Sequence, residues 1–109
     1  MIVSRTSSRP SVKRVMLADD HAVVRRGLRT LIEGVPGWEV CAEAADGNET
    51  VALAAETKPD VLIMDLSMPG LGGVDATIQI RKILPQIEVL ILTIHESDRL
   101  AGQALRAGA

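Results

Sequence analysis

The chain has 109 residues, of which 47% are hydrophobic, and its net charge is −2. This length suits one compact domain, and this composition favours an ordered fold over a disordered chain. No apolar run reaches the roughly 18 residues that a membrane-spanning helix needs. The start of the chain also lacks the apolar stretch of a secretory signal. We therefore expect a cytoplasmic protein that does not associate with membranes.

The charges are unevenly distributed along the chain. Residues 1–14 contain basic side chains and no acidic one, so all 14 acidic residues lie in the remainder. An acidic body argues against direct nucleic-acid binding by this domain. Residues 1–12 show no periodicity and are predicted to form a disordered leader.

The first half of the chain predicts a strand, a helix, a second strand and a second helix. An apolar strand is expected over residues 12–18, followed by a helix from His21 that Gly34 stops. The apolar stripe of this helix is predicted to consist of Val24, Leu28, Leu31 and Ile32. Three arginines lie outside that stripe: Arg25, Arg26 and Arg29. Alternation of apolar and polar residues over 38–44 predicts a half-exposed strand, and an Ala-rich helix is expected over residues 49–57.

The second half repeats this alternation. Four apolar residues in a row, Val61–Met64, predict a strand over residues 60–65 that is buried on both faces. A helix is expected over residues 74–84, and a similarly buried strand over residues 88–93. Ser97 is a suitable N-cap for a last helix to about Arg106.

Strands that alternate with helices at this spacing predict a parallel sheet with helices on both faces. The expected fold class is therefore α/β, a doubly wound sheet in three αβα layers. The second strand has the character of an edge strand. This fits the flavodoxin-like strand order 2-1-3-4-5, of which the chain supplies the first four strands.

Polar residues follow three of the expected strands. Asp19 and Asp20 follow the first strand, Asp65 ends the third, and Thr93 ends the fourth. Parallel strands end at the same edge of a sheet, so these carboxylates are expected to crowd together and to repel one another unless a cation joins them. Oxygen ligands suit a hard cation such as Mg²⁺. With that cation present, Asp65 could act as a nucleophile toward a phosphoryl group, and Thr93 could offer its hydroxyl to a phosphoryl oxygen.

Each of these residues also has a plainer interpretation. Asp19 and Asp20 could cap the first helix, Asp65 could be a turn residue, and Thr93 could be an ordinary strand residue. A phosphatase or phosphotransferase of the haloacid dehalogenase type also uses an aspartate nucleophile at a strand end. That family has a second aspartate two residues later, where this chain has Ser67.

The chain from about Val12 to its end resembles the receiver domain of bacterial two-component response regulators. Four segments carry the resemblance: Leu17-Ala18-Asp19-Asp20-His21, Met64-Asp65-Leu66-Ser67-Met68-Pro69-Gly70, Leu92-Thr93 and Ala104-Leu105-Arg106-Ala107-Gly108-Ala109. The opening Asp-Asp-His, the segment 24–28 and the segment 92–95 are similar to the NarL/LuxR subgroup. The resemblance implies a receiver domain over residues 13–109.

The resemblance implies roles for individual residues. Asp65 would accept a phosphoryl group from a sensor histidine kinase. Asp20 and Asp65 would bind Mg²⁺ together with the backbone carbonyl of Ser67, and Asp19 would hold a water on the metal.

Two further positions would act once the phosphoryl group is in place. Thr93 would move toward the phosphoryl group and relay the change to the surface beyond the fourth strand. Ser67 and His95 would tune the lifetime of the phosphoryl group, although the plainer interpretation of His95, as an exposed loop histidine, is the one we favour from the sequence.

The resemblance also implies what the domain does as a whole. It would be a phosphoacceptor signalling domain rather than an enzyme on an external substrate, although family members catalyse their own phosphorylation and dephosphorylation. Members of the subgroup carry a C-terminal helix-turn-helix domain, so DNA would be bound only through a domain absent from this chain. The alternative is a stand-alone receiver that signals by protein contact.

The resemblance departs from the family at the end of the chain. Family members continue past a motif like Ala107-Gly108-Ala109 to an aromatic residue, a lysine, a fifth strand and a fifth helix. This sequence ends at Ala109, so we expect these parts to be missing, and coupling to Thr93 to be weakened. An apolar sheet surface beside the first helix would then be uncovered, which favours a dimer or a strand-swapped association.

Overall fold

Strands and helices alternate along the described residues, which are 12–66, 68–92 and 106–108 of this computed structural model. The elements are β1 (Lys13–Ala18), α1 (Ala22–Glu33), β2 (Trp38–Ala44), α2 (Gly47–Thr57), β3 (Val61–Met64), α3 (Gly73–Ile83) and β4 (Glu88–Ile91). The predicted leader and the predicted last helix fall outside the described residues, apart from Val12 and Arg106. None of the described helices is long and apolar enough to cross a bilayer.

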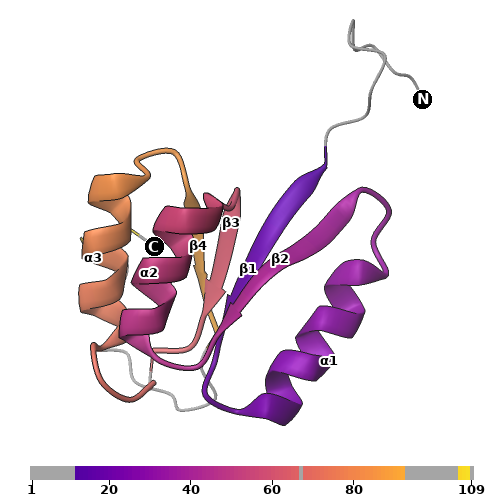
Figure 1. The fold of residues 1–109 in the computed structure, drawn as a ribbon, viewed down its shortest axis with the longest axis horizontal. Helices are drawn as coiled ribbons and strands as arrows, with labels where there is room; N and C mark the ends of the chain where they lie inside the picture. The colour runs from indigo at the N-terminus through magenta and orange to yellow at the C-terminus, as the bar shows by residue number, and fades with distance from the viewer. Residues whose placement is uncertain (1–11, 67, 93–105, 109) are drawn as a thin grey trace, which may run out of the picture.

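The strands form one sheet in the order β2-β1-β3-β4, and each neighbouring pair is parallel. Helices α2 and α3 cover one face of this sheet, and α1 covers the other face beside β1 and β2 (Figure 1). The predicted three-layer, flavodoxin-like arrangement is therefore confirmed.

The core lies on both sides of β1 because successive residues of a strand point to opposite faces. Met16 packs toward α2 and α3 with Leu62, Met64 and Ile80, all of which are fully buried. On the other face, a smaller cluster joins β1 to α1, formed by Val15, Leu17 and Ile32. These two apolar layers fix β1 and β3 at the centre of the sheet.

The prediction that β3 and β4 are buried on both faces is wrong. Leu62 and Val89 are buried beneath α2 and α3, but Leu90 is 53% exposed and Leu92 is 42% exposed. Val61 and Ile63 are also only partly buried. Among the described helices only α1 lies on this face, and it packs on β1 and β2. The apolar sheet surface that the sequence predicts beside the first helix is present.

The predicted apolar stripe of α1 is also wrong in one position. Ile32 is buried and Leu28 packs against it, but Leu31 is 71% exposed. Each helical residue advances by about 100°, so a helix that directs Ile32 at the sheet turns Leu31 away from it. The same rotation brings Arg25, seven positions before Ile32, toward β2 instead of toward solvent.

Helix α2 begins two residues earlier than the sequence predicts. The carboxylate of Asp46 accepts a hydrogen bond of 2.7 Å from the backbone N–H of Glu49, and the Glu49 side chain accepts one of 2.7 Å from the N–H of Ala45. This reciprocal pairing satisfies N–H groups that a helix start leaves without partners. It also fixes the N-terminus of α2 beside the loop that follows β3.

Candidate functional site

The ladder of backbone hydrogen bonds continues past the strand ends. The N–H of Asp19 donates to Ala44 at 3.0 Å, the N–H of Asp65 donates to Ala18 at 2.9 Å, and the N–H of Leu92 donates to Met64 at 2.9 Å. Asp19 and Asp65 are therefore held at the carboxyl edge of the sheet by the pairing that orders the strands. This is the edge at which open parallel sheets bind their ligands.

The structure brings together the carboxylates of Asp19, Asp20 and Asp65. One oxygen of each, together with a ring nitrogen of His21, lies within 4.8 Å of all the others. Asp65 is 2% exposed and Asp19 is 5% exposed, whereas Asp20 is open to solvent. The predicted meeting of these three side chains is confirmed, and the burial of Asp19 and Asp65 strengthens the repulsion between their charges.

His21 is the member of this cluster that the sequence analysis missed. Its Nδ1 lies 2.9 Å from Oδ1 of Asp19, 3.1 Å from Oδ1 of Asp20 and 3.9 Å from Oδ2 of Asp65. The hydrogen bond to Asp19, followed by the charge of Asp20, raises the pKa of His21 above its ordinary value of 6.5. The signal is its position directly after two aspartates, which the sequence analysis uses as the start of a helix and as a marker of the NarL/LuxR subgroup but not as part of the site.

The interpretation of the two aspartates as helix caps is wrong. The N-cap of α1 is His21, and its side chain makes no capping hydrogen bond. Oδ1 of Asp19 instead accepts a 2.7 Å hydrogen bond from the backbone N–H of His21. This bond turns the chain sharply between β1 and α1 and keeps the Asp19 carboxylate at the sheet edge.

Arg25 also contacts this region from the first turn of α1. Its Nη1 donates to the backbone carbonyl of Asp19 at 2.6 Å, and its Nε donates to Glu43 on β2 at 3.2 Å. The apolar pattern of the sequence predicts that Arg25 lies outside the buried stripe. The rotation of α1, which the apolar pattern alone did not fix, brings it to the site.

The loop after Asp65 packs closely against its surroundings. Leu66 and Met68 are buried, and Gly70 has a φ of +77°, a conformation that favours glycine. A Cβ at Gly73 would lie 2.9 Å from Cα of Leu66. The start of α3 therefore packs directly against Leu66, the residue that follows Asp65.

Three predicted site residues lie outside the described residues: Ser67, Thr93 and His95. The predicted roles of these three residues rest on the sequence alone. Leu92 is the last described residue before Thr93, and its N–H bonds to the residue before Asp65.

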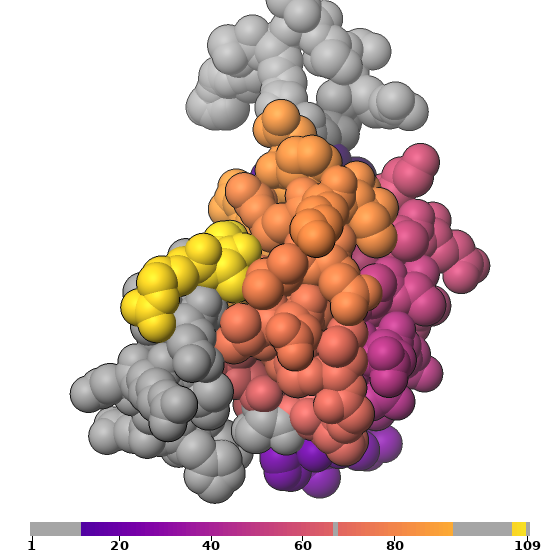
Figure 2. Space-filling model, turned by 90° about the vertical axis from the view of Figure 1, so that its left-hand side faces the viewer, coloured from indigo at the N-terminus to yellow at the C-terminus, as the bar shows by residue number. Residues whose placement is uncertain are grey.

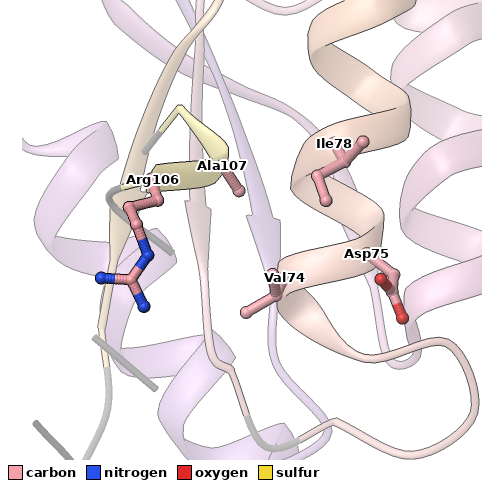
Figure 3. Close-up of a pocket in the computed structure, with 5 residues that line it drawn as sticks. All are labelled: Val74, Asp75, Ile78, Arg106 and Ala107. Carbon is pink, nitrogen blue, oxygen red and sulfur yellow. The ribbon is translucent and has the colours of Figure 1, made fainter. Parts of the chain in front are cut away.

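A separate hollow lies between α3 and residues 106–108, on the side of the molecule shown in Figure 2. Gly108 lies against the side chain of Arg81, since a Cβ at Gly108 would be 3.1 Å from Nε of Arg81. The hollow has a volume of about 670 Å³ and is lined by Val74, Asp75, Ile78, Arg106 and Ala107 (Figure 3). None of these residues belongs to the acidic cluster, so the hollow is not part of the candidate site.

Comparisons with known proteins agree with this geometry. Residues 15–109 match the family described as the response regulator receiver domain. The transcriptional regulatory protein LiaR of Bacillus subtilis is 45% identical over 96 residues, which are 88% of this chain and 46% of LiaR. The chain thus spans about half the length of the curated relatives it matches.

Solved structures show the same similarity. A two-component response regulator of the LuxR family from Aurantimonas sp. SI85-9A1 is 48% identical, with a TM-score of 0.85 over 91% of this chain and 71% of that one. A DNA-binding response regulator of the LuxR family from Staphylococcus aureus is 26% identical, with a TM-score of 0.83 over 90% of this chain and 82% of that one.

Proposed function

The chain belongs to the response regulator receiver domain family, and from this premise we propose that Asp65 is its phosphoryl acceptor. The donor would be the phosphohistidine of a sensor histidine kinase. The observation that carries the proposal is the position of Asp65, which is 2% exposed at the carboxyl edge of the sheet beside Asp19 and Asp20. A buried nucleophile surrounded by charge is a common arrangement for group transfer.

The chemical step is a displacement at phosphorus. A carboxylate oxygen of Asp65 forms the new P–O bond while the P–N bond to the donor imidazole breaks, and the imidazole nitrogen takes up the departing electron pair and then a proton. The ladder bond from the N–H of Asp65 to Ala18 holds the acceptor in place during this transfer. Positioning of this kind contributes much of the catalysis in phosphoryl transfer.

The donor atoms at the site fit a hard divalent cation. Asp19, Asp20 and Asp65 offer carboxylate oxygens that converge within 4.8 Å, the ligand type that Mg²⁺ prefers. We therefore propose that these carboxylates hold Mg²⁺, joined by the backbone carbonyl of Ser67 as the family resemblance implies. When bound, the cation would offset the negative charge of an incoming phosphoryl group.

We further propose that the phosphorylated domain controls a DNA-binding output. LiaR is named a transcriptional regulatory protein, and the Staphylococcus aureus structure is titled a DNA-binding response regulator. This chain matches less than half of LiaR, so the output would lie in sequence outside the matched residues. Thr93, the residue after Leu92, would relay the change, and Ser67 and His95 would set how long the phosphoryl group persists.

The experiment is to incubate the chain with acetyl phosphate and Mg²⁺ and to follow its intact mass. We expect one phosphoryl adduct that requires Mg²⁺ and is removed by hydroxylamine, as an acyl phosphate should be. Asp65→Asn should abolish the adduct, whereas Asp75→Asn should retain it because Asp75 is an exposed carboxylate on α3. An undiminished adduct in Asp65→Asn would overturn the assignment.

A further inference from the structure

Arg25 makes a direct contact with the backbone of the acidic site. Its Nη1 donates a 2.6 Å hydrogen bond to the carbonyl oxygen of Asp19, which belongs to the peptide that joins Asp19 to Asp20. The Arg25 side chain is 22% exposed, so this bond is partly shielded from water. A charged donor at this distance makes one of the stronger hydrogen bonds found in proteins.

A second contact, with Glu43, orients the guanidinium of Arg25. Its Nε donates to Oε1 of Glu43 on β2 at 3.2 Å. The other carboxylate oxygen of Glu43 accepts from Nη1 of Arg29 at 2.5 Å. Glu43 therefore connects two successive turns of α1 to the sheet. It binds Nε of Arg25, so that Nη1 of Arg25 is directed at the carbonyl of Asp19.

The peptide before Asp19 is consequently held at its N–H, and the peptide between Asp19 and Asp20 is held at its carbonyl. The N–H of Asp19 bonds to Ala44 of β2, and its carbonyl bonds to Arg25 of α1. Rotation of the Asp19–Asp20 peptide would break the bond to Arg25 and would turn the Asp20 carboxylate relative to Asp65.

We propose that Arg25 is a positioning residue for divalent cation binding. It fixes the Asp19–Asp20 peptide in the orientation that directs both carboxylates at the cation, and Glu43 orients Arg25 for this purpose. The inference rests on the proposed function, since it assumes that the acidic cluster binds Mg²⁺. Groups that orient metal ligands in this way typically change metal affinity by about 10–100-fold when they are removed.

Arg29 provides the matched control. It lies one turn after Arg25 on the same helix and pairs with the same Glu43, but its Nε donates to Glu33 and not to the acidic site. If Arg25 only tied α1 to the sheet, then Arg25→Ala and Arg29→Ala would affect the protein alike. A specific effect on Mg²⁺ affinity separates positioning from a general effect on stability.

The experiment is calorimetric titration of the 109-residue chain with Mg²⁺, alongside urea unfolding of each variant. We expect Arg25→Ala to weaken Mg²⁺ binding about tenfold or more, and Arg29→Ala by less than about twofold. Arg25→Lys should recover part of the affinity, because an ammonium group can still donate to the Asp19 carbonyl. At saturating Mg²⁺, the maximal rate of phosphorylation by acetyl phosphate should return close to the wild-type rate in Arg25→Ala.

Several outcomes would overturn the inference. Unchanged Mg²⁺ affinity in folded Arg25→Ala would refute it, as would equal losses in Arg25→Ala and Arg29→Ala. If Arg25→Ala does not fold, Glu43→Gln provides the second test, because it weakens the pairing that orients Arg25 without removing Arg25. A Mg²⁺ affinity of Glu43→Gln equal to that of Arg29→Ala would refute the proposal. A wild-type chain that binds no Mg²⁺ would overturn the proposed metal site, and this inference with it.

Discussion

Replacing Gly47 by alanine tests how the start of α2 holds the loop that follows Asp65. A Cβ at position 47 would lie 1.8 Å from the carbonyl oxygen of Leu71 and 2.7 Å from its carbonyl carbon. Both are backbone atoms, so the clash is relieved only by a shift of the helix or of the loop. The N–H of Gly47 also contacts the carbonyl of Pro69 at 3.5 Å.

The magnitude follows from two opposing effects. Overpacking of this kind costs about 1–3 kcal/mol. Alanine recovers up to about 1 kcal/mol over glycine inside a helix, and less at the first helical residue, where Gly47 lies. We therefore expect a net loss of about 1–2 kcal/mol in the free energy of unfolding. For a domain of this size, each kcal/mol lowers the melting temperature by roughly 4–8 °C.

The assay is urea unfolding followed by circular dichroism, with Gly27→Ala as the matched control. Gly27 lies inside α1, and a Cβ added there would have no neighbouring atom within 4 Å, so its replacement should stabilise the chain by about 0.5–1 kcal/mol. Equal stability of Gly47→Ala and Gly27→Ala would show that the close approach of α2 to the loop does not constrain the fold.

Two further predictions concern local interactions. Asp46→Ala removes the acceptor for the N–H of Glu49 and should cost about 1 kcal/mol in urea unfolding, whereas an unchanged midpoint would contradict the capping assignment. The pKa of His21, followed by NMR, should lie above 6.5 and should fall in Asp19→Asn, because the hydrogen bond to Asp19 is the main cause of the shift. A raised pKa means that the protonated imidazole stabilises the folded chain below about pH 6.5 and that this contribution is lost as the pH rises through the folded value. Equal pH dependence of unfolding in wild type and His21→Gln would refute this.

The sequence predicts the parts of this molecule that follow from periodicity and topology. The apolar run Val61–Met64 places a strand correctly, and alternation of strands with helices leads to the parallel sheet. Because parallel strands end at one edge, the meeting of Asp19, Asp20 and Asp65 follows without knowledge of any loop. The strand order and the acidic site could therefore both be predicted from the sequence.

Features that depend on the rotation of a helix about its axis or on the course of a loop could not be predicted from the sequence. The rotation of α1 about its axis exposes Leu31 and brings Arg25 to the carbonyl of Asp19, and the apolar pattern allowed several rotations. The approach of Gly47 to Leu71 joins two segments far apart in the sequence, and only the packed loop defines it. The uncovered face around Leu90 likewise depends on which helices lie over the sheet.

The most direct test of Asp65 as the phosphoryl acceptor locates the phosphoryl group on the chain. After incubation with acetyl phosphate and Mg²⁺, borohydride reduces an aspartyl phosphate to homoserine, and mass spectrometry of the peptides identifies the converted position. We expect homoserine at position 65 and unmodified aspartate at Asp19 and Asp20. Conversion at either of those two positions, with Asp65 unmodified, would contradict the assignment of Asp65 as the phosphoryl acceptor.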